Sequence, residues 1–278
     1  MLEAGYVLHR RQYRETSLLL DMFTYRHGIV SLIAKGAYKG KSPSSAQLQA
    51  FRPLLVEWVG RNELKTLTKC ESPSLPLSFP NNNRYVAMYL NELLHKLFVD
   101  NPPSPDLFEC YVVSLDALTD ASAQVASLLR KFEIKLLQTL GLMPDLSIDW
   151  LGEPVSANRA YYFSSESTLV PLTEDETGQS GMRALPTGTW YRGRLLISLS
   201  GLIQSQADMS VAEDVRANSV CEGGLPYESV GMRSGAESPN ELESSSAKHL
   251  MRMLIDGALN GATLHSREMM KQIAKNAR

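Results

Sequence analysis

The chain has 278 residues, of which 44% are apolar and 21% charged, a composition typical of a soluble globular protein with two or three domains. No run approaches the ~20 apolar residues of a membrane span, and the first residues, MLEAGYVLHRR, lack the apolar segment of a signal peptide. The three cysteines are far apart, which disfavours a disulfide framework. We therefore expect a cytoplasmic protein that does not contact a membrane.

The formal net charge of −2 conceals an uneven distribution. Residues 1–70 contain 11 Lys and Arg against 5 Asp and Glu, whereas residues 151–246 contain 6 against 13. A basic first segment on an acidic remainder indicates an anionic partner for that segment. The alternative is a solvated surface of uneven sign.

The first seventy residues have the pattern of short strands. Runs rich in Leu, Val, Ile and aromatic residues occur at 6–9, 17–23, 29–34, 51–59 and 64–68, with turn-forming residues between them. Five strands with one long loop after the third predict a small closed barrel of the OB type, which commonly binds single-stranded nucleic acid.

The loop after the third predicted strand contains GAYKGKS at 36–42, which has the residue types of a phosphate-binding loop. A P-loop needs four residues between its glycines and a helix directly after its lysine. Only three residues separate Gly36 from Gly40, and Pro43 follows Ser42. We therefore expect no nucleotide site and no ATP-dependent enzyme.

Beyond the prolines at 73–80 the apolar residues recur with a helical period. Helices are predicted from about 85 to 97, 105 to 118 and 123 to 140, and again at 246–259 and 264–273. Residues 150–246 mix strand-like pieces such as 160–163 with polar sequence, and 208–246 is acidic, rich in Gly and Ser, and expected to be partly disordered.

These patterns predict an α+β multidomain protein. We expect an OB-fold DNA-binding domain at 1–79, a helical domain at 80–149, a small mixed domain at 150–246 that is partly flexible, and C-terminal helices at 247–278 that pack on the helical domain.

Several separated motifs together resemble one protein family. They are GYVLH at 5–9, RETSLLLD at 14–21, LIAKGA at 32–37, FRPLLV at 51–56, GRNELKTL at 60–67, NELL at 91–94, LRKFE at 129–133, LLQTLG at 136–141 and SRE at 266–268. In this order they resemble the bacterial DNA repair family RecO. The resemblance is dense to about residue 145 and thin over 150–246.

The resemblance implies an N-terminal OB-fold, a helical domain and a third small domain. It also implies an ATP-independent recombination mediator that binds single- and double-stranded DNA and anneals complementary strands. Such proteins work with RecR, and in some bacteria RecF, to help RecA replace the single-stranded DNA-binding protein SSB, whose acidic tail ending in Phe they bind.

The chain also departs from the family pattern. Relatives often carry a more basic stretch after AKGA, where this chain interrupts its lysines with Tyr38, Gly40 and Ser42. Some members hold zinc with four cysteines in the third domain, but residues 150–246 contain only Cys221 here. We therefore predict no structural zinc and no cofactor.

Cations in the barrel segment are the candidate DNA ligands, because Lys and Arg neutralise phosphates without reading sequence. They are Arg10, Arg11, Arg14, Lys35, Lys39, Lys41, Arg61 and Lys65. Tyr13, Tyr25 and Tyr38 are candidates for stacking on bases. Strand alternation would send some of these side chains to the opposite face, and strand aromatics are often core residues.

A second candidate site combines cations with apolar residues on the predicted helices, a pairing suited to an acidic peptide that ends in an aromatic carboxylate. Its residues are Leu128, Arg130, Lys131, Lys135, Lys248 and Arg252. The alternative is a solvated basic face over a helical core.

No catalytic or metal-binding motif is present in the sequence. The histidines at 9, 27, 95, 249 and 265 lack metal-ligand spacing, no HExxH or GxSxG occurs, and the acidic residues 174–176 suit a solvated loop. We predict a non-enzymatic DNA-binding mediator, associated with the nucleoid, that anneals strands and acts with RecR on RecA loading. The alternative is a generic single-stranded nucleic-acid-binding OB module without mediator activity.

Overall fold

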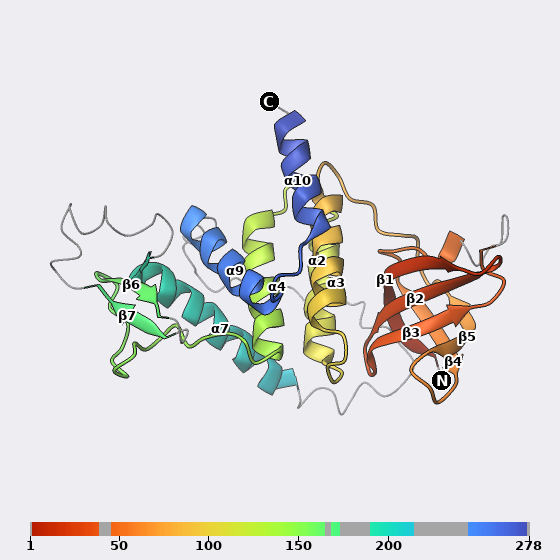
Figure 1. Cartoon of the computed structure of the whole chain (residues 1–278), viewed down its shortest axis with the longest axis horizontal. Helices are drawn as coiled ribbons and strands as arrows, with labels where there is room; N and C mark the ends of the chain where they lie inside the picture. Colours follow the sequence, from red (N-terminus) through yellow and green to blue (C-terminus); the bar gives the residue numbers. More distant parts are fainter. Residues whose placement is uncertain (1, 39–45, 165–167, 173–189, 214–243, 277–278) are drawn as a thin grey trace. The chain divides into compact units, whose positions relative to one another are not determined.

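The computed structural model describes residues 2–38, 46–164, 168–172, 190–213 and 244–276 (Figure 1). The chain forms two compact units. The first comprises residues 1–125 and 259–278, and the second comprises residues 126–258. The predicted division at residues 79, 149 and 246 stays a prediction.

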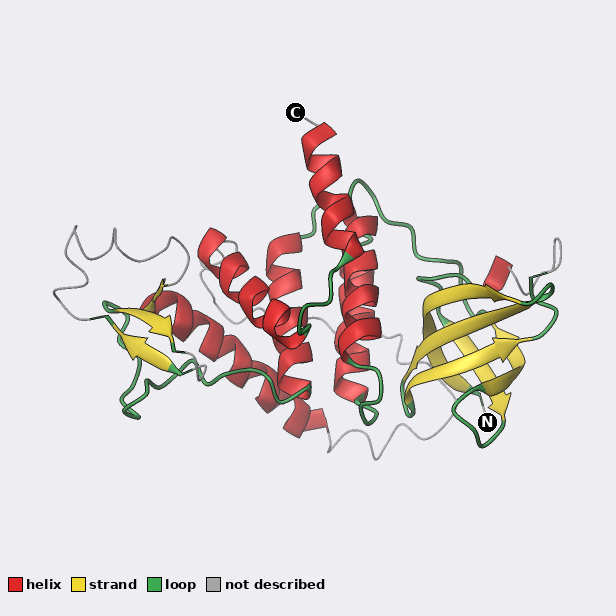
Figure 2. Cartoon of the chain, viewed as in Figure 1, coloured by secondary structure: helices red, strands yellow, loops and turns green. Residues whose placement is uncertain are grey.

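A closed five-stranded barrel occupies the start of the first unit (Figure 2). Its strands are β1 (Glu3–Tyr13), β2 (Ser17–Thr24), β3 (Gly28–Ala34), β4 (Leu54–Val59) and β5 (Lys65–Glu71). They close in the order β1-β2-β3-β5-β4, with β3 and β5 parallel and the other neighbours antiparallel. The expected five-stranded barrel of the OB type is confirmed.

The barrel interior follows from strand alternation. On β2, Leu18, Leu20 and Met22 are buried in the core while Leu19 and Asp21 between them are only half-buried. Each fully buried aliphatic side chain contributes roughly 1.5–3 kcal/mol relative to an exposed one. The remaining core members are Val7, Val30, Leu32, Ala34, Ala37, Leu48, Leu54 and Val56.

Helices α2 (Asn83–Leu97) and α3 (Pro105–Ala117) pack on the outside of this barrel through aromatic side chains. Tyr6 of β1 lies 5.5 Å from the Tyr111 ring, and Phe23 of β2 lies 5.2 Å from the Phe108 ring, measured between centroids. Tyr6 and Phe23 are register partners, so one cross-strand pair presents both rings to the helices.

Helix α10 (His265–Asn276) completes the first unit by packing on α2. The Arg267 guanidinium lies 5.5 Å from the centroid of the Tyr89 ring, a cation–π contact that links the two helices.

The second unit combines three helices with a small sheet. The helices are α4 (Val125–Thr139), α7 (Gly193–Glu213) and α9 (Ser245–Ala258). The sheet has the order β7-β6-β8, formed by β6 (Ala160–Phe163), β7 (Leu169–Pro171) and β8 (Trp190–Arg192). The Tyr191 hydroxyl of β8 lies 3.8 Å from Met253 Sδ of α9, which joins sheet and helix.

Helix α7 is the largest element that the sequence pattern did not predict. Its buried residues Leu195, Leu196, Leu199 and Leu202 have helical spacing, and the helix continues to Glu213. Of the segment 208–246, residues 208–213 belong to α7 and residues 214–243 lie outside the described residues, so the expectation of partial disorder there stays a prediction. Among the described residues, no helix combines the length and apolarity needed to cross a bilayer.

Candidate nucleic-acid interface

The end of the β1–β2 hairpin carries three of the predicted DNA ligands. Residues 9–12 of β1 are all exposed, unlike the buried residues 5–8 before them. Arg11 pairs in register with Leu19, and Arg10 pairs with the core residue Leu20. Because register partners share a face, Arg11 lies on the outer face of the hairpin and Arg10 on the face that continues the barrel interior.

Arg10 and Arg14 are held by local contacts. Arg10 Nη1 donates to Leu48 O at 3.2 Å, which holds this guanidinium over the end of the barrel. Arg14 has a positive φ of 54° in the hairpin turn, and its guanidinium carbon lies 5.2 Å from the centroid of the Tyr13 ring. Both residues remain exposed.

Lys35 reaches the same hairpin from β3. Ala34 pairs with Leu18 at the end of the β2–β3 ladder, so Lys35 lies one residue beyond it on the outward side. The backbone N–H of Tyr38 donates to Thr16 O at 2.9 Å, which fastens the following loop to the hairpin turn. The structure therefore gathers Arg11, Arg14 and Lys35 at one end of the outer barrel face, and we call these three residues the hairpin patch.

The other predicted DNA ligands are placed differently. Arg61 is exposed in the β4–β5 turn, while Lys65 is half-buried and pairs with the core residue Leu32. Neither belongs to the hairpin patch. Lys39 and Lys41 lie outside the described residues.

The electrostatics of the hairpin patch favour an external anion. Within the described part of the chain, none of Arg11, Arg14 and Lys35 forms an ion pair. Exposed cations without a carboxylate partner can neutralise phosphates without first breaking a salt bridge.

The three tyrosine candidates separate into two groups. Tyr13 is half-buried and Tyr38 is 44% exposed, and both border the hairpin patch. Tyr25 instead faces α3, where its ring lies 5.7 Å from Phe108 and its hydroxyl donates to Glu109 Oε1 at 3.3 Å. Burial, with the nearby Glu109 carboxylate, raises the pKa of Tyr25. Tyr25 thus belongs to the barrel–helix contact, and the stacking of a base on its ring stays a prediction.

The second predicted site lies in the second unit, on α4 and α9. Leu128, Lys131 and Lys135 are half-buried, and Lys248 and Arg252 are exposed. Arg252 Nε lies 3.6 Å from Asp256 Oδ2, one helical turn away.

Arg130, one of the cations predicted for this site, is buried. It is only 6% exposed, and its Nη1 lies 2.8 Å from Glu133 Oε2. Glu133, Ile134 and Leu137, which follow Arg130 by three, four and seven residues, are also buried. Arg130 therefore lies on the buried face of α4. An acidic peptide would have to displace this internal pair to reach it.

A closed five-stranded barrel with two helices packed on it and a basic hairpin at one end defines an OB-type barrel protein. Two family models match the chain: Recombination protein O N terminal over residues 1–74, and Recombination protein O C terminal over residues 82–197. The chain belongs to the RecO family, and this membership supports a role in DNA repair.

Three relatives illustrate the similarity, each a DNA repair protein RecO. The protein of Marinobacter nauticus is 36% identical over 270 residues, 96% of this chain and 92% of its own length. That of Pseudoalteromonas atlantica is 35% identical over 269 residues, 96% of this chain and 93% of its own. That of Actinobacillus pleuropneumoniae serotype 5b is 44% identical over 167 residues, 60% of this chain and 70% of its own.

Proposed function

We propose that this chain is a non-enzymatic, cytoplasmic recombination mediator that binds single- and double-stranded DNA and anneals complementary strands. With RecR, it helps RecA load on SSB-coated single-stranded DNA. The observation that carries the proposal is the hairpin patch, three exposed cations without an ion pair among the described residues. Family membership supplies the process in which such binding acts.

Strand annealing requires that two polyanions approach each other. Cations on an exposed barrel face lower the repulsion between the two strands by neutralising phosphates, and this needs no ATP. Tyr38, which is 44% exposed beside the patch, offers a ring on which a base can stack.

Annealing of complementary oligonucleotides coated with SSB, measured without ATP, tests the proposal. We expect the full chain to accelerate annealing over buffer and the triple variant Arg11/Arg14/Lys35→Ala to lose most of the acceleration. The control variant Arg84/Lys271/Lys275→Ala loses the same positive charge, from exposed side chains of α2 and α10. It should anneal strands as the wild-type chain does. Failure of the wild-type chain to accelerate annealing would contradict the proposal.

A second candidate function is a generic single-stranded nucleic-acid-binding module without mediator activity. The buried Arg130–Glu133 pair favours it, because that pair removes one cation from the predicted SSB-tail site. Fluorescence anisotropy with an acidic peptide ending in Phe separates the two candidates. A mediator binds the peptide and loses affinity in Lys248/Arg252→Ala, whereas the generic module does not bind it.

A further inference from the structure

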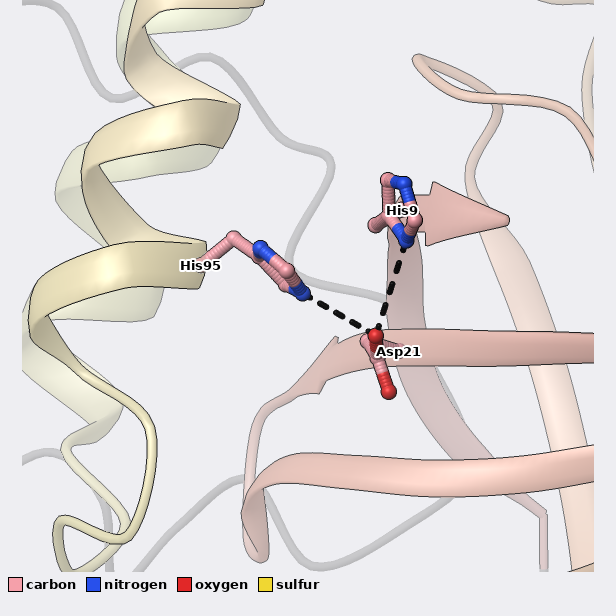
Figure 3. A group of neighbouring side chains, drawn as sticks. All are labelled: His9, Asp21 and His95. Carbon is pink, nitrogen blue, oxygen red and sulfur yellow. Dashed lines mark hydrogen bonds and ion pairs between the residues drawn. The ribbon is translucent and has the colours of Figure 1, made fainter. Parts of the chain in front are cut away.

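Two histidines and one aspartate meet at the junction of the barrel and α2 (Figure 3). His95 Nε2 lies 3.0 Å from Asp21 Oδ2, and His9 Nδ1 lies 3.7 Å from the same oxygen. The three ligand atoms all lie within 4.8 Å of one another. Sequence spacing does not reveal this group, because Asp21 and His95 are 74 residues apart.

A β-bulge brings His9 to this position. Val7 pairs with Met22, but the next paired residue of β1 is His9, which lies opposite Asp21. Leu8 is thus the extra residue, and it shifts the alternation by one. Without the bulge, Leu8 would pair with Asp21 in the ladder, and the His9 imidazole would lie on the other side of β1.

The same bulge positions α2. Buried Asn91 donates from Nδ2 to Val7 O at 3.4 Å and to Leu8 O at 3.3 Å. Its own Oδ1 accepts from the Tyr111 hydroxyl at 2.6 Å, which fixes the amide. His95 follows Asn91 by one helical turn on the same face of α2. The anchoring of Asn91 therefore positions the His95 imidazole next to Asp21.

The carboxylate between the two imidazoles is also oriented. Ser31 Oγ of β3 donates to Asp21 Oδ1 at 2.7 Å, which leaves Oδ2 directed at the histidines. The imidazole rings lie 5.0 Å apart, tilted by 32°. Metal-binding carboxylates in proteins are commonly held by such an outer hydrogen bond.

We propose that His9, Asp21 and His95 bind a divalent first-row transition-metal ion, with Zn²⁺ the preferred ion, and that water completes its coordination. Two imidazole nitrogens and one carboxylate oxygen are a donor set that suits Zn²⁺. Tetrahedral bonds of about 2.0–2.2 Å separate neighbouring ligand atoms by about 3.4 Å. The 3.0 and 3.7 Å separations bracket that value, and His9, whose side chain is 51% exposed, is free to make the adjustment.

The ion would join two strands of the barrel to α2. Asp21 and His9 belong to β2 and β1, and His95 belongs to the helix, so a bound ion would stabilise the first unit as a whole. This inference is independent of DNA binding, since it uses none of the hairpin patch.

Calorimetric titration of the chelator-treated full chain with Zn²⁺ tests the site. The expected result is one equivalent bound and, at 100-fold excess over Kd, a rise in Tm of about 5 °C that EDTA reverses. Titration with Co²⁺ should give the visible absorption bands of a low-coordinate ion. His95→Gln, which keeps an amide to donate to Asp21, should weaken binding by more than about 100-fold, and Ser31→Ala by about tenfold.

Two controls distinguish Zn²⁺ binding at this site from binding to other histidines and from unfolding of a variant. His249→Ala removes an exposed histidine of α9 and should leave Zn²⁺ affinity unchanged. Circular dichroism without metal shows whether each variant is folded. The proposal would be overturned if Zn²⁺ affinity were unchanged in both His9→Ala and His95→Gln, or if the folded wild-type chain did not bind Zn²⁺. The three residues would then serve only as a hydrogen-bonded contact between the barrel and α2.

Discussion

Glu92 of α2 caps the start of α10 by binding Ser266, 174 residues further along the chain. Its Oε2 accepts from Ser266 Oγ at 2.5 Å and from Ser266 N at 2.9 Å, and its Oε1 accepts from His265 N at 2.8 Å. The first N–H groups of a helix have no partner inside the helix, so one carboxylate from a neighbouring helix satisfies two of them. The C-terminal helix is therefore fixed to α2 at its first turn.

Replacing Glu92 with Ala should loosen α10 selectively. Loss of a capping acceptor costs about 1–2 kcal/mol, which corresponds to roughly 5- to 30-fold faster opening. Amide hydrogen exchange of residues 265–276 measures it, with Asp116→Ala, an exposed carboxylate on α3, as the control. Equal exchange in both variants would show that the cap does not hold the helix.

The Glu92 cap should also depend on pH. Burial raises the pKa of Glu92, but the hydrogen bonds from Ser266 and His265, with Lys96 nearby, outweigh burial and lower it overall. A lowered carboxyl pKa gives stability that is complete above the ordinary value of 4.5 and is lost as the pH falls through the folded-state value. The difference in α10 protection between wild type and Glu92→Gln should thus be largest near pH 7 and shrink below pH 4.5; a constant difference would contradict this.

Asn91 should matter more for stability than its size suggests. Asn91→Leu leaves the carbonyls of Val7 and Leu8 without this donor and takes the acceptor from the Tyr111 hydroxyl. Each buried group that is left unsatisfied costs about 1–3 kcal/mol. Thermal unfolding of Asn91→Leu, Tyr111→Phe and the double variant measures the effect, and Asn91→Leu should be the least stable of the three. A Tm for Asn91→Leu at or above that of Tyr111→Phe would refute the anchoring role.

The barrel and most helices could be predicted because their patterns are local. Alternation along Leu18, Leu20 and Met22 predicts a half-buried strand, and Gly141 predicts the end of α4, where its φ is +67°. Helix α7 was missed although Leu195 and Leu199 have helical spacing, because the surrounding Ser and Gly residues are typical of loops.

The parts that could not be predicted depend on contacts between distant segments. The meeting of His9 with His95 needs a bulge at Leu8 and an anchor at Asn91, and neither has a signature in the sequence. Arg130 was expected among the cations of the peptide site, projecting from the apolar stripe of the helix. The signal that could have placed Arg130 inside was Glu133, an opposite charge three residues later and next to the buried Ile134.

The Arg130–Glu133 pair gives a stability prediction. Arg130→Ala leaves the Glu133 carboxylate buried without this cation, which typically costs about 3–5 kcal/mol. Arg130→Met/Glu133→Leu removes both charges and should be markedly more stable than the single variant. Urea denaturation measures both, with the exposed Lys248→Ala as the control; an Arg130→Ala protein as stable as that control would place Arg130 in solvent.

The hairpin patch is the centre of the functional account, and the salt dependence of single-stranded DNA binding tests it most directly. Each phosphate contact on a single strand contributes about 0.7 to the slope of log K against log salt concentration. Arg11/Arg14/Lys35→Ala should therefore bind more weakly, with a slope shallower by about 2, while Arg84/Lys271/Lys275→Ala keeps the wild-type slope. Equal slopes for the two triple variants would contradict the account, because any three cations would then serve as well as those of the hairpin patch.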